Sequence, residues 1–177
     1  MFSATLPSGA ASCEELRGIP LKVEYFSEVY SKMRRGVVPR PNRATPEDLR
    51  DMKFVFLCLD QGQAKRSLVE ALIGWGIPFI DASMGVELTD GVLGGVLSVL
   101  TVTPEHSSHV QQRGSFSDAN PDGIYSRGVQ IADLNALNAA LAVIRWKRLC
   151  GFYRDERREH YATYALDTNT MTNDECA

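Results

Sequence analysis

A strand–helix–strand pattern in residues 54–81 constrains the fold of this chain more than any other feature. The segment reads FVFLCLDQGQAKRSLVEALIGWGIPFID. The apolar run at 54–59 is typical of a parallel strand that is buried on both faces. Residues 64–75 place apolar side chains at helical spacing in a helix ended by Gly74 and Gly76, and residues 77–80 form a second short apolar run. Because parallel strands are joined by such a crossover, the pattern predicts an α/β fold with a Rossmann-like, mostly parallel sheet flanked by helices.

Four other segments carry a local structural signal. Apolar residues recur at helical spacing in 22–33, and Pro46 followed by two acidic residues is typical of a helix start. The alternation in residues 93–103 predicts a further strand. Nearly every side chain in 129–149 is apolar or small, which is typical of a helix that is buried or packs on another subunit.

The length and composition predict one domain spanning residues 1–177. A chain of 177 residues with 44% hydrophobic content is long and apolar enough to form a real core. Within that domain we expect a polar crossover loop at 104–126 and a polar C-terminal tail at 151–177. A loop as long as 104–126 is usually functional, a crossover or disordered, and these alternatives remain open.

Charge and hydropathy argue against two classes of protein. The formal net charge of -3, with 23% charged residues, lacks the basic excess of a typical nucleic-acid-binding surface. The longest mostly apolar stretch, residues 92–102, is too short to span a membrane. The first twelve residues lack both a charged start and a continuous apolar region, so no signal peptide is expected. We therefore expect a cytoplasmic protein that binds neither nucleic acid nor membrane.

The cysteines and histidines offer little for a zinc site. The four cysteines are widely separated and form no CxxC pair. Cys58 lies in an apolar run and is expected to be a small core residue, and in a reducing compartment all four would be free thiols. His106 and His109 lie three residues apart in the polar segment, where a solvated loop is a better interpretation than a metal site.

Two apolar runs end on a carboxylate, Asp60 and Asp81. Ligands of open α/β sheets bind at the carboxyl ends of the strands, where both residues would lie. Asp60 could therefore ligate Mg²⁺, a hard cation that prefers oxygen ligands, or it could cap the following helix. Asp81 is more simply structural. Residues 61–63 contain one glycine and cannot form a phosphate-binding nest of amides.

Three segments resemble the ThiF/MoeB/ubiquitin-activating adenylyltransferase family, over roughly residues 8–170. They are SGAASCEELRGIPLKVEYFSEVYSKM, KFVFLCLDQGQAKRSLVEALIGWGIPFIDASMGVE and YSRGVQIADLNALNAALAVIRWKRLCGFYRD, and the last is similar to the long helix of bacterial ThiF family proteins. The resemblance implies that Asp60 is a magnesium ligand and that Lys22, at the start of a helix, contacts the phosphates of ATP. It also implies a nucleotide-binding role for Lys65, the basic residue about one turn into the helix that follows Asp60.

The resemblance implies ATP-dependent adenylation of the C-terminal carboxylate of a ubiquitin-like or sulfur-carrier protein, with ATP and Mg²⁺ as cofactors. Attack of a carboxylate on the α-phosphate joins two anions, so cations must neutralise the growing charge. Lys22 and magnesium held by Asp60 would supply that positive charge, which makes both residues candidate catalytic residues. Homodimers are common in this family, and the apolar helix at 129–149 fits a dimer.

One departure from the family leaves two functions open. The 177 residues contain no GxGxxG loop, so the domain lacks the first βαβ unit that normally holds the nucleotide. One alternative is an adenylyltransferase whose missing strands are supplied by another chain. The other is a truncated, non-catalytic ThiF-like remnant that acts as a dimerisation or protein-interaction module. The same missing glycines weaken a third interpretation, a Rossmann dehydrogenase.

Overall fold

The computed structural model describes residues 14, 17, 21–59, 62–114 and 131–174. By its internal contacts the chain divides into two units, Met1–Thr45 and Pro46–Ala177. The first unit contains helix α1 (Lys22–Ser31), in agreement with the expected helix at 22–33. The Glu24 carboxylate accepts the backbone N–H of Leu21 at 3.1 Å, which satisfies one of the free donors at the start of this helix. Tyr25, Phe26 and Tyr30 lie in ring contact along it.

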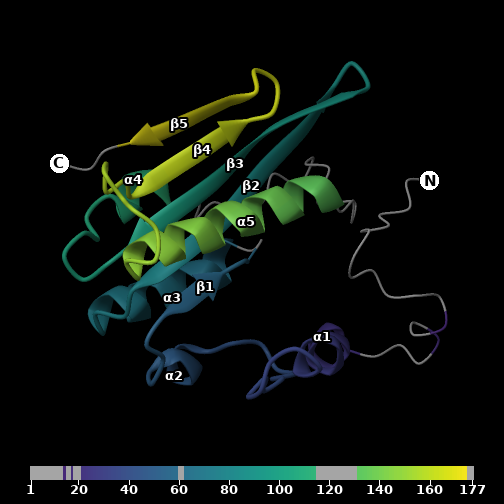
Figure 1. Ribbon diagram of the computed structural model, residues 1–177, viewed down its shortest axis with the longest axis vertical. Coiled ribbons are helices and arrows are strands. Elements are labelled where there is room, and N and C mark those ends of the chain that lie inside the picture. The colour runs from purple at the N-terminus through teal and green to yellow at the C-terminus, as the bar shows by residue number, and fades with distance from the viewer. Residues whose placement is uncertain (1–13, 15–16, 18–20, 60–61, 115–130, 175–177) are drawn as a thin grey trace. The chain divides into compact units, whose positions relative to one another are not determined.

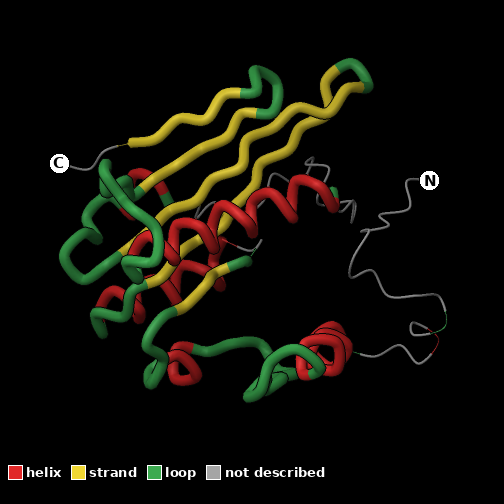
Figure 2. The backbone as a smooth tube through the Cα atoms, viewed as in Figure 1, coloured by secondary structure: helices red, strands yellow, loops and turns green. Residues whose placement is uncertain are grey.

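The second unit is built on an open five-stranded mixed sheet with helices, in the strand order β1-β2-β3-β4-β5 (Figures 1 and 2). Its strands are β1 (Val55–Leu57), β2 (Phe79–Thr89), β3 (Val92–Val102), β4 (Tyr161–Ala165) and β5 (Thr170–Asp174). Strands β1 and β2 are parallel, and the three other neighbouring pairs are antiparallel. The α/β class is confirmed. The parallel pairing that the sequence predicted for most of the sheet is found for one pair.

Tight turns explain two of the three antiparallel pairs. Strands β2 and β3 are joined by Asp90 and Gly91, which both have positive φ, 52° and 81°. A two-residue Asp-Gly loop of this kind is typical of a β-hairpin, and a loop this short joins only antiparallel strands. Strands β4 and β5 form a second hairpin, with Asn169 at φ 51° in its turn.

The predicted strand–helix–strand unit is confirmed as β1, helix α3 (Gly62–Gly74) and β2. One boundary differs, because β2 continues to Thr89 instead of ending at Asp81. Asp81 pairs with Leu57 on one side and with Leu100 on the other. It is therefore an interior residue of a central strand, and the prediction that it ends a strand is wrong.

Opposite faces of the sheet carry separate apolar clusters, since neighbouring residues of a strand point to opposite sides. Helix α3 contributes Leu68, Val69 and Leu72 to one cluster. Helix α5 (Ala132–Leu149), within the expected helix at 129–149, packs against the other. The first cluster contains Val55, Leu57, Leu68, Val69, Leu72, Ile77, Phe79, Leu100, Val102 and Val110. The second contains Ile80, Val99 and Ala142, with Phe54, Ala82, Leu141, Trp146 and Leu149 packed around them.

Strand β1 is less buried than its composition predicted. It lies at one edge of the described sheet, and its residues alternate between buried and exposed. Phe56 is 43% exposed, in ring contact with Phe54 and Trp146. Cys58 is also exposed, so its prediction as a core residue is wrong, because the strand and its burial end at Leu57. Cys150 is an exposed free thiol.

The segments predicted to be polar loop and tail contain regular structure. Helix α4 (Val110–Arg113) lies within the expected loop and buries Val110. The C-terminal segment returns to the sheet as β4 and β5, and Arg113 forms an ion pair with Asp174 across to it. Helix α2 (Pro46–Leu49) begins at Pro46, as its sequence predicted. No helix within the described ranges is long and apolar enough to cross a membrane.

Candidate functional site

The predicted site residues fall in different parts of the molecule. Asp60, the predicted magnesium ligand or helix cap, lies outside the described residues. In the sequence it follows β1 and precedes α3. Lys22 is the first residue of α1 in the first unit, and it is exposed. Lys65 lies in α3 of the second unit, where its side chain is buried.

Lys65 forms a buried ion pair with Asp81. Its Nζ lies 2.6 Å from Asp81 Oδ2 and donates to Ser83 Oγ at 2.7 Å. Ser83 Oγ lies 3.2 Å from each carboxylate oxygen of Asp81 and so closes a three-membered network. The side chains of Lys65 and Asp81 are 2% and 4% exposed, so solvent does not screen their interaction.

Burial and charge act in opposite directions on Asp81. Burial raises the pKa of its carboxyl, while the Lys65 ammonium and the hydrogen bond from Ser83 oppose that rise. A carboxylate buried to this degree is tolerated because its partner is within hydrogen-bond distance. The network therefore fixes α3 to β2.

The sequence contained a signal for this ion pair. Lys65 lies three, four and seven residues before Leu68, Val69 and Leu72, which places it on the buried face of α3. A lysine on a buried helix face needs an acceptor, and Asp81 is in the strand beneath that helix. The pair was missed because β2 was expected to end at Asp81.

Helix α5 is joined to the same part of β2 by Asn138. Its Nδ2 donates to the backbone oxygen of Ser83 at 3.0 Å, and Ser98 Oγ donates to that oxygen at 3.4 Å. Asn138 is 6% exposed, and its Oδ1 has no hydrogen-bond partner among the residues that the structure describes. An unpaired acceptor at this depth costs about 1–3 kcal/mol.

All three histidines of the chain come together at the end of β3. The ring centroid of His160 lies 4.5 Å from that of His106 and 5.6 Å from that of His109. Ring nitrogens of His109 and His160 lie 2.9 and 3.4 Å from the backbone oxygen of Thr101. Burial lowers the pKa of both His109 and His160, so both rings favour the neutral form. The sequence suggested proximity of His106 and His109, but His160 reaches them only through the pairing of β3 with its neighbour.

These histidines do not form a metal site in the described part of the chain. No group of three or more histidine, cysteine, aspartate or glutamate side chains there is arranged to hold a metal ion. The two ring contacts with the backbone of Thr101 account for one nitrogen each on His109 and His160. His109 is half-buried beside Thr101, so the solvated loop expected for His106 and His109 describes only the exposed His106.

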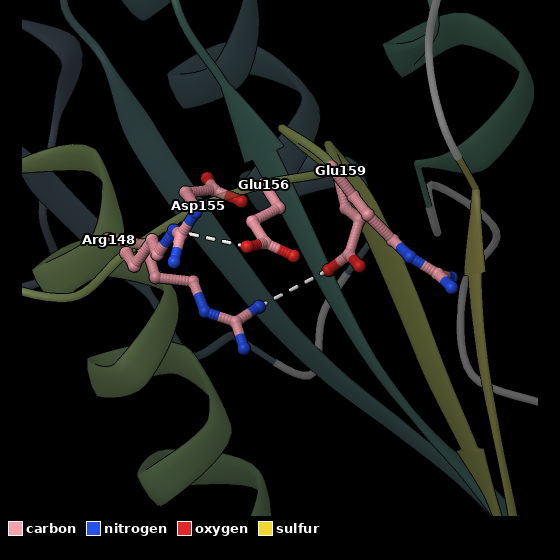
Figure 3. Close-up of a pocket in the computed structure, with 6 residues that line it drawn as sticks. Arg148, Asp155, Glu156 and Glu159 are labelled. Carbon is pink, nitrogen blue, oxygen red and sulfur yellow. Dashed lines mark hydrogen bonds and ion pairs between the residues drawn. The ribbon is translucent and has the colours of Figure 1, made fainter.

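A charged pocket of about 260 Å³ lies beside the segment that connects α5 to β4 (Figure 3). Arg148 Nη1 lies 3.3 Å from Glu159 Oε2, and Arg154 Nε lies 3.0 Å from Glu156 Oε1. On helix α5, the more deeply buried Arg145 has its Nη1 2.9 Å from Oδ2 of Asp155 in that segment. The pocket is lined by three arginines and three acids, namely Arg148, Arg154, Arg157, Asp155, Glu156 and Glu159. Its charges balance, so it carries no excess positive charge for an anion.

A scan of the sequence against protein-family models finds no match, and a search of curated proteins finds none either.

Proposed function

We propose that this chain forms part of a ThiF-type adenylyltransferase, which activates the C-terminal carboxylate of a ubiquitin-like or sulfur-carrier protein with ATP and Mg²⁺. The observation that carries the proposal is the parallel β1–α3–β2 unit, whose first strand ends three residues before Asp60 in the sequence. In open α/β sheets, ligands bind beyond the carboxyl ends of parallel strands. Asp60 follows that end of β1.

The sheet supports a larger Rossmann-like arrangement. Strand β1 has one strand partner among the described residues, although parallel strands are usually interior. Phe56 is 43% exposed on this edge strand. We propose that a further βαβ unit, carrying the glycine-rich loop and lying outside these 177 residues, would pair with β1. It could belong to the same polypeptide or to another one.

The described residues alone do not fit a nucleotide. They contain no GxGxxG loop, and the Lys65 ammonium is already bound by Asp81 and Ser83. A direct contact from Lys65 to a phosphate, which stays a prediction, would require this buried ion pair to open. The roles of Lys22 at the phosphates and of Asp60 at the metal stay predictions from the resemblance. Mg²⁺ would supply the positive charge that carboxylate activation needs.

Titration calorimetry with ATP, in the presence and absence of Mg²⁺, tests this proposal. We expect binding that depends on Mg²⁺, and we expect Asp60→Asn to remove that dependence because an amide is a weaker ligand for a hard cation. Lys22→Met should weaken binding by about tenfold, the value of one charge-assisted hydrogen bond. The matched controls are the exposed residues Asp51→Asn and Lys32→Met.

Circular dichroism on the same samples makes a negative result informative. If the protein is folded and releases no heat with ATP and Mg²⁺, this chain alone is not the enzyme. Unchanged magnesium dependence in Asp60→Asn would refute the assignment of the metal ligand even if ATP binds.

A second candidate function is self-association through helix α5. Leu137, Val143 and Ile144 are 37%, 43% and 40% exposed on this helix. The other exposed residues from 136 to 144 are alanines, at positions 136, 139 and 140, and the exposed Asp133 lies one turn before this stretch. An uncharged stretch of this kind on a well-formed helix is typical of a subunit contact. In this alternative the chain is a non-catalytic interaction module that forms a homodimer.

Sedimentation equilibrium tests the second candidate separately from ATP binding. A dimer should form, and Val143→Glu should weaken it by at least about tenfold, because a charge would be buried without a partner. Val92→Glu makes the same change at an exposed site in β3 and should leave the dimer intact. A monomer at every concentration of the wild-type protein would exclude this function.

A further inference from the structure

A cavity of about 180 Å³ lies between helix α5 and strands β3, β4 and β5. One part of its wall is apolar and includes Val99, Leu141 and Ala162. The rest is polar and includes Thr101 and Arg145. Small-molecule sites commonly combine a mostly apolar lining with a few polar groups that orient the ligand.

Two buried polar atoms on residues that line this cavity have no hydrogen-bond partner in the described parts of the chain. They are Thr101 Oγ1 and Arg145 Nε. Thr101 is 0% exposed and Arg145 is 6% exposed. Buried donors are almost always hydrogen-bonded in folded proteins, so two unpaired ones beside a single cavity indicate that the cavity receives a hydrogen-bond acceptor.

The charges around the cavity indicate that this acceptor is neutral. The Arg145 guanidinium is paired with Asp155, and that of Arg148 with Glu159. Burial also lowers the pKa of His160, which lines the cavity, and so favours its uncharged ring. An anionic ligand would add a negative charge beside carboxylates whose cations are already matched, and burying such a charge is costly.

We propose that this cavity binds a small uncharged molecule that has an apolar body and one carbonyl or hydroxyl oxygen. The oxygen accepts hydrogen bonds from Arg145 Nε and Thr101 Oγ1, and the body packs on Val99, Leu141 and Ala162. A dry cavity of about 150 Å³ is large enough for benzene, so this one suits a molecule slightly larger than benzene. The proposal does not depend on adenylation.

Three probes of nearly equal shape test the proposal in titrations followed by amide chemical shifts. Acetophenone has the required carbonyl, α-methylstyrene replaces its oxygen with a CH₂ group, and benzoate adds a negative charge. We expect saturable shifts from acetophenone in β3, β4 and α5. Both other probes should bind about tenfold more weakly, which corresponds to the loss of one hydrogen bond.

Two variants locate the binding. Ala162→Leu should fill the cavity and abolish the acetophenone shifts, and Thr101→Val should weaken binding while preserving the shape of the side chain. Thr163→Val is the matched control, since it changes a threonine of β4 that does not line the cavity. It should bind acetophenone as the wild-type protein does.

Several results would overturn the proposal. These are equal affinities for the three probes, shifts that map outside the cavity, or no shift at all, which would mean that the cavity holds water only. If Ala162→Leu does not fold, Thr101→Val decides the question, because unchanged binding in that variant would exclude the assigned contact.

Discussion

Helices α3 and α5 cover opposite faces of one sheet, and each helix carries a buried basic residue paired with an acid. Under α3, Lys65 Nζ contacts both Asp81 and Ser83, and a large apolar cluster surrounds the helix. On the α5 side, Arg145 Nε and Asn138 Oδ1 lack partners among the described residues, the apolar cluster is smaller, and a cavity is present. The comparison indicates that the α3 face provides stability, whereas the α5 face keeps unsatisfied groups that suit binding.

The largest expected effect comes from breaking the ion pair under α3. Lys65→Met leaves the Asp81 carboxylate buried without its cation and should lower the free energy of unfolding by about 3–5 kcal/mol at neutral pH. Urea denaturation measures this loss. Lys53→Met, which removes an exposed lysine of the same unit, is the control and should change little.

The pH dependence of Lys65→Met identifies the cause of that loss. Burial raises the pKa of Asp81 above 3.8, and removing Lys65 removes a group that opposes the rise. The folded variant therefore binds a proton more tightly than the unfolded chain, so its stability relative to wild type should recover as the pH falls through the raised pKa. A deficit that is the same at every pH would mean that lost packing, not an unpaired charge, causes the effect.

Truncating one leucine on each face compares the packing of the two clusters. Leu72 is 0% exposed under α3, so Leu72→Ala should destabilise the protein by about 2–5 kcal/mol. Leu141 on α5 is half-buried and borders the cavity, so Leu141→Ala should cost less, about 1–2 kcal/mol. Equal losses in urea denaturation would contradict the difference that we draw between the faces.

The histidine cluster should respond to acid with the opposite sign to Asp81. Burial lowers the pKa of His109 and His160 below 6.5, and His106, Arg113 and Arg145 add positive charge nearby. The unfolded chain binds these protons more readily, so stability present above about pH 6.5 is lost as the pH falls through the lowered pKa values.

The free energy of unfolding, measured by urea denaturation from about pH 8 to about pH 5, tests this assignment, because this range includes the ordinary pKa of histidine. His109→Gln removes one titrating ring and should reduce the pH slope relative to wild type. An unchanged slope would show that the cluster does not titrate as its burial predicts.

Local patterns were sufficient to predict the α/β class, the β1–α3–β2 unit and helices α1, α2 and α5. Helical spacing, the Pro46 start and the Gly74 end each depend on a few neighbouring residues. The pairing of the later strands depends on contacts that are distant in sequence. The Asp90–Gly91 turn is a local signal for the β2–β3 hairpin. The second hairpin follows a charged segment that has no strand pattern of its own.

The site was harder to predict than the fold because its polar groups come from separate elements. Lys65 and Asp81 lie 16 positions apart but 2.6 Å apart in space, and His160 meets His106 only after β4 has paired with β3. Lys22 was assigned from resemblance, and no local pattern tests that role. Asp60 remains a prediction, since it lies outside the described residues.

The smallest expected effect comes from an ion pair at the surface. Arg154 Nε lies 3.0 Å from Glu156 Oε1 in the charged pocket of Figure 3, close to the length of the Lys65–Asp81 contact, but the two side chains are 87% and 69% exposed. Solvent screens this pair, so Arg154→Ala should change the free energy of unfolding by less than about 0.5 kcal/mol. Urea denaturation of Arg154→Ala and Lys65→Met compares two ion pairs that differ in burial more than in the distance between their atoms. If the two substitutions cost the same, burial is not what makes the ion pair under α3 important, and the contrast between the two faces fails.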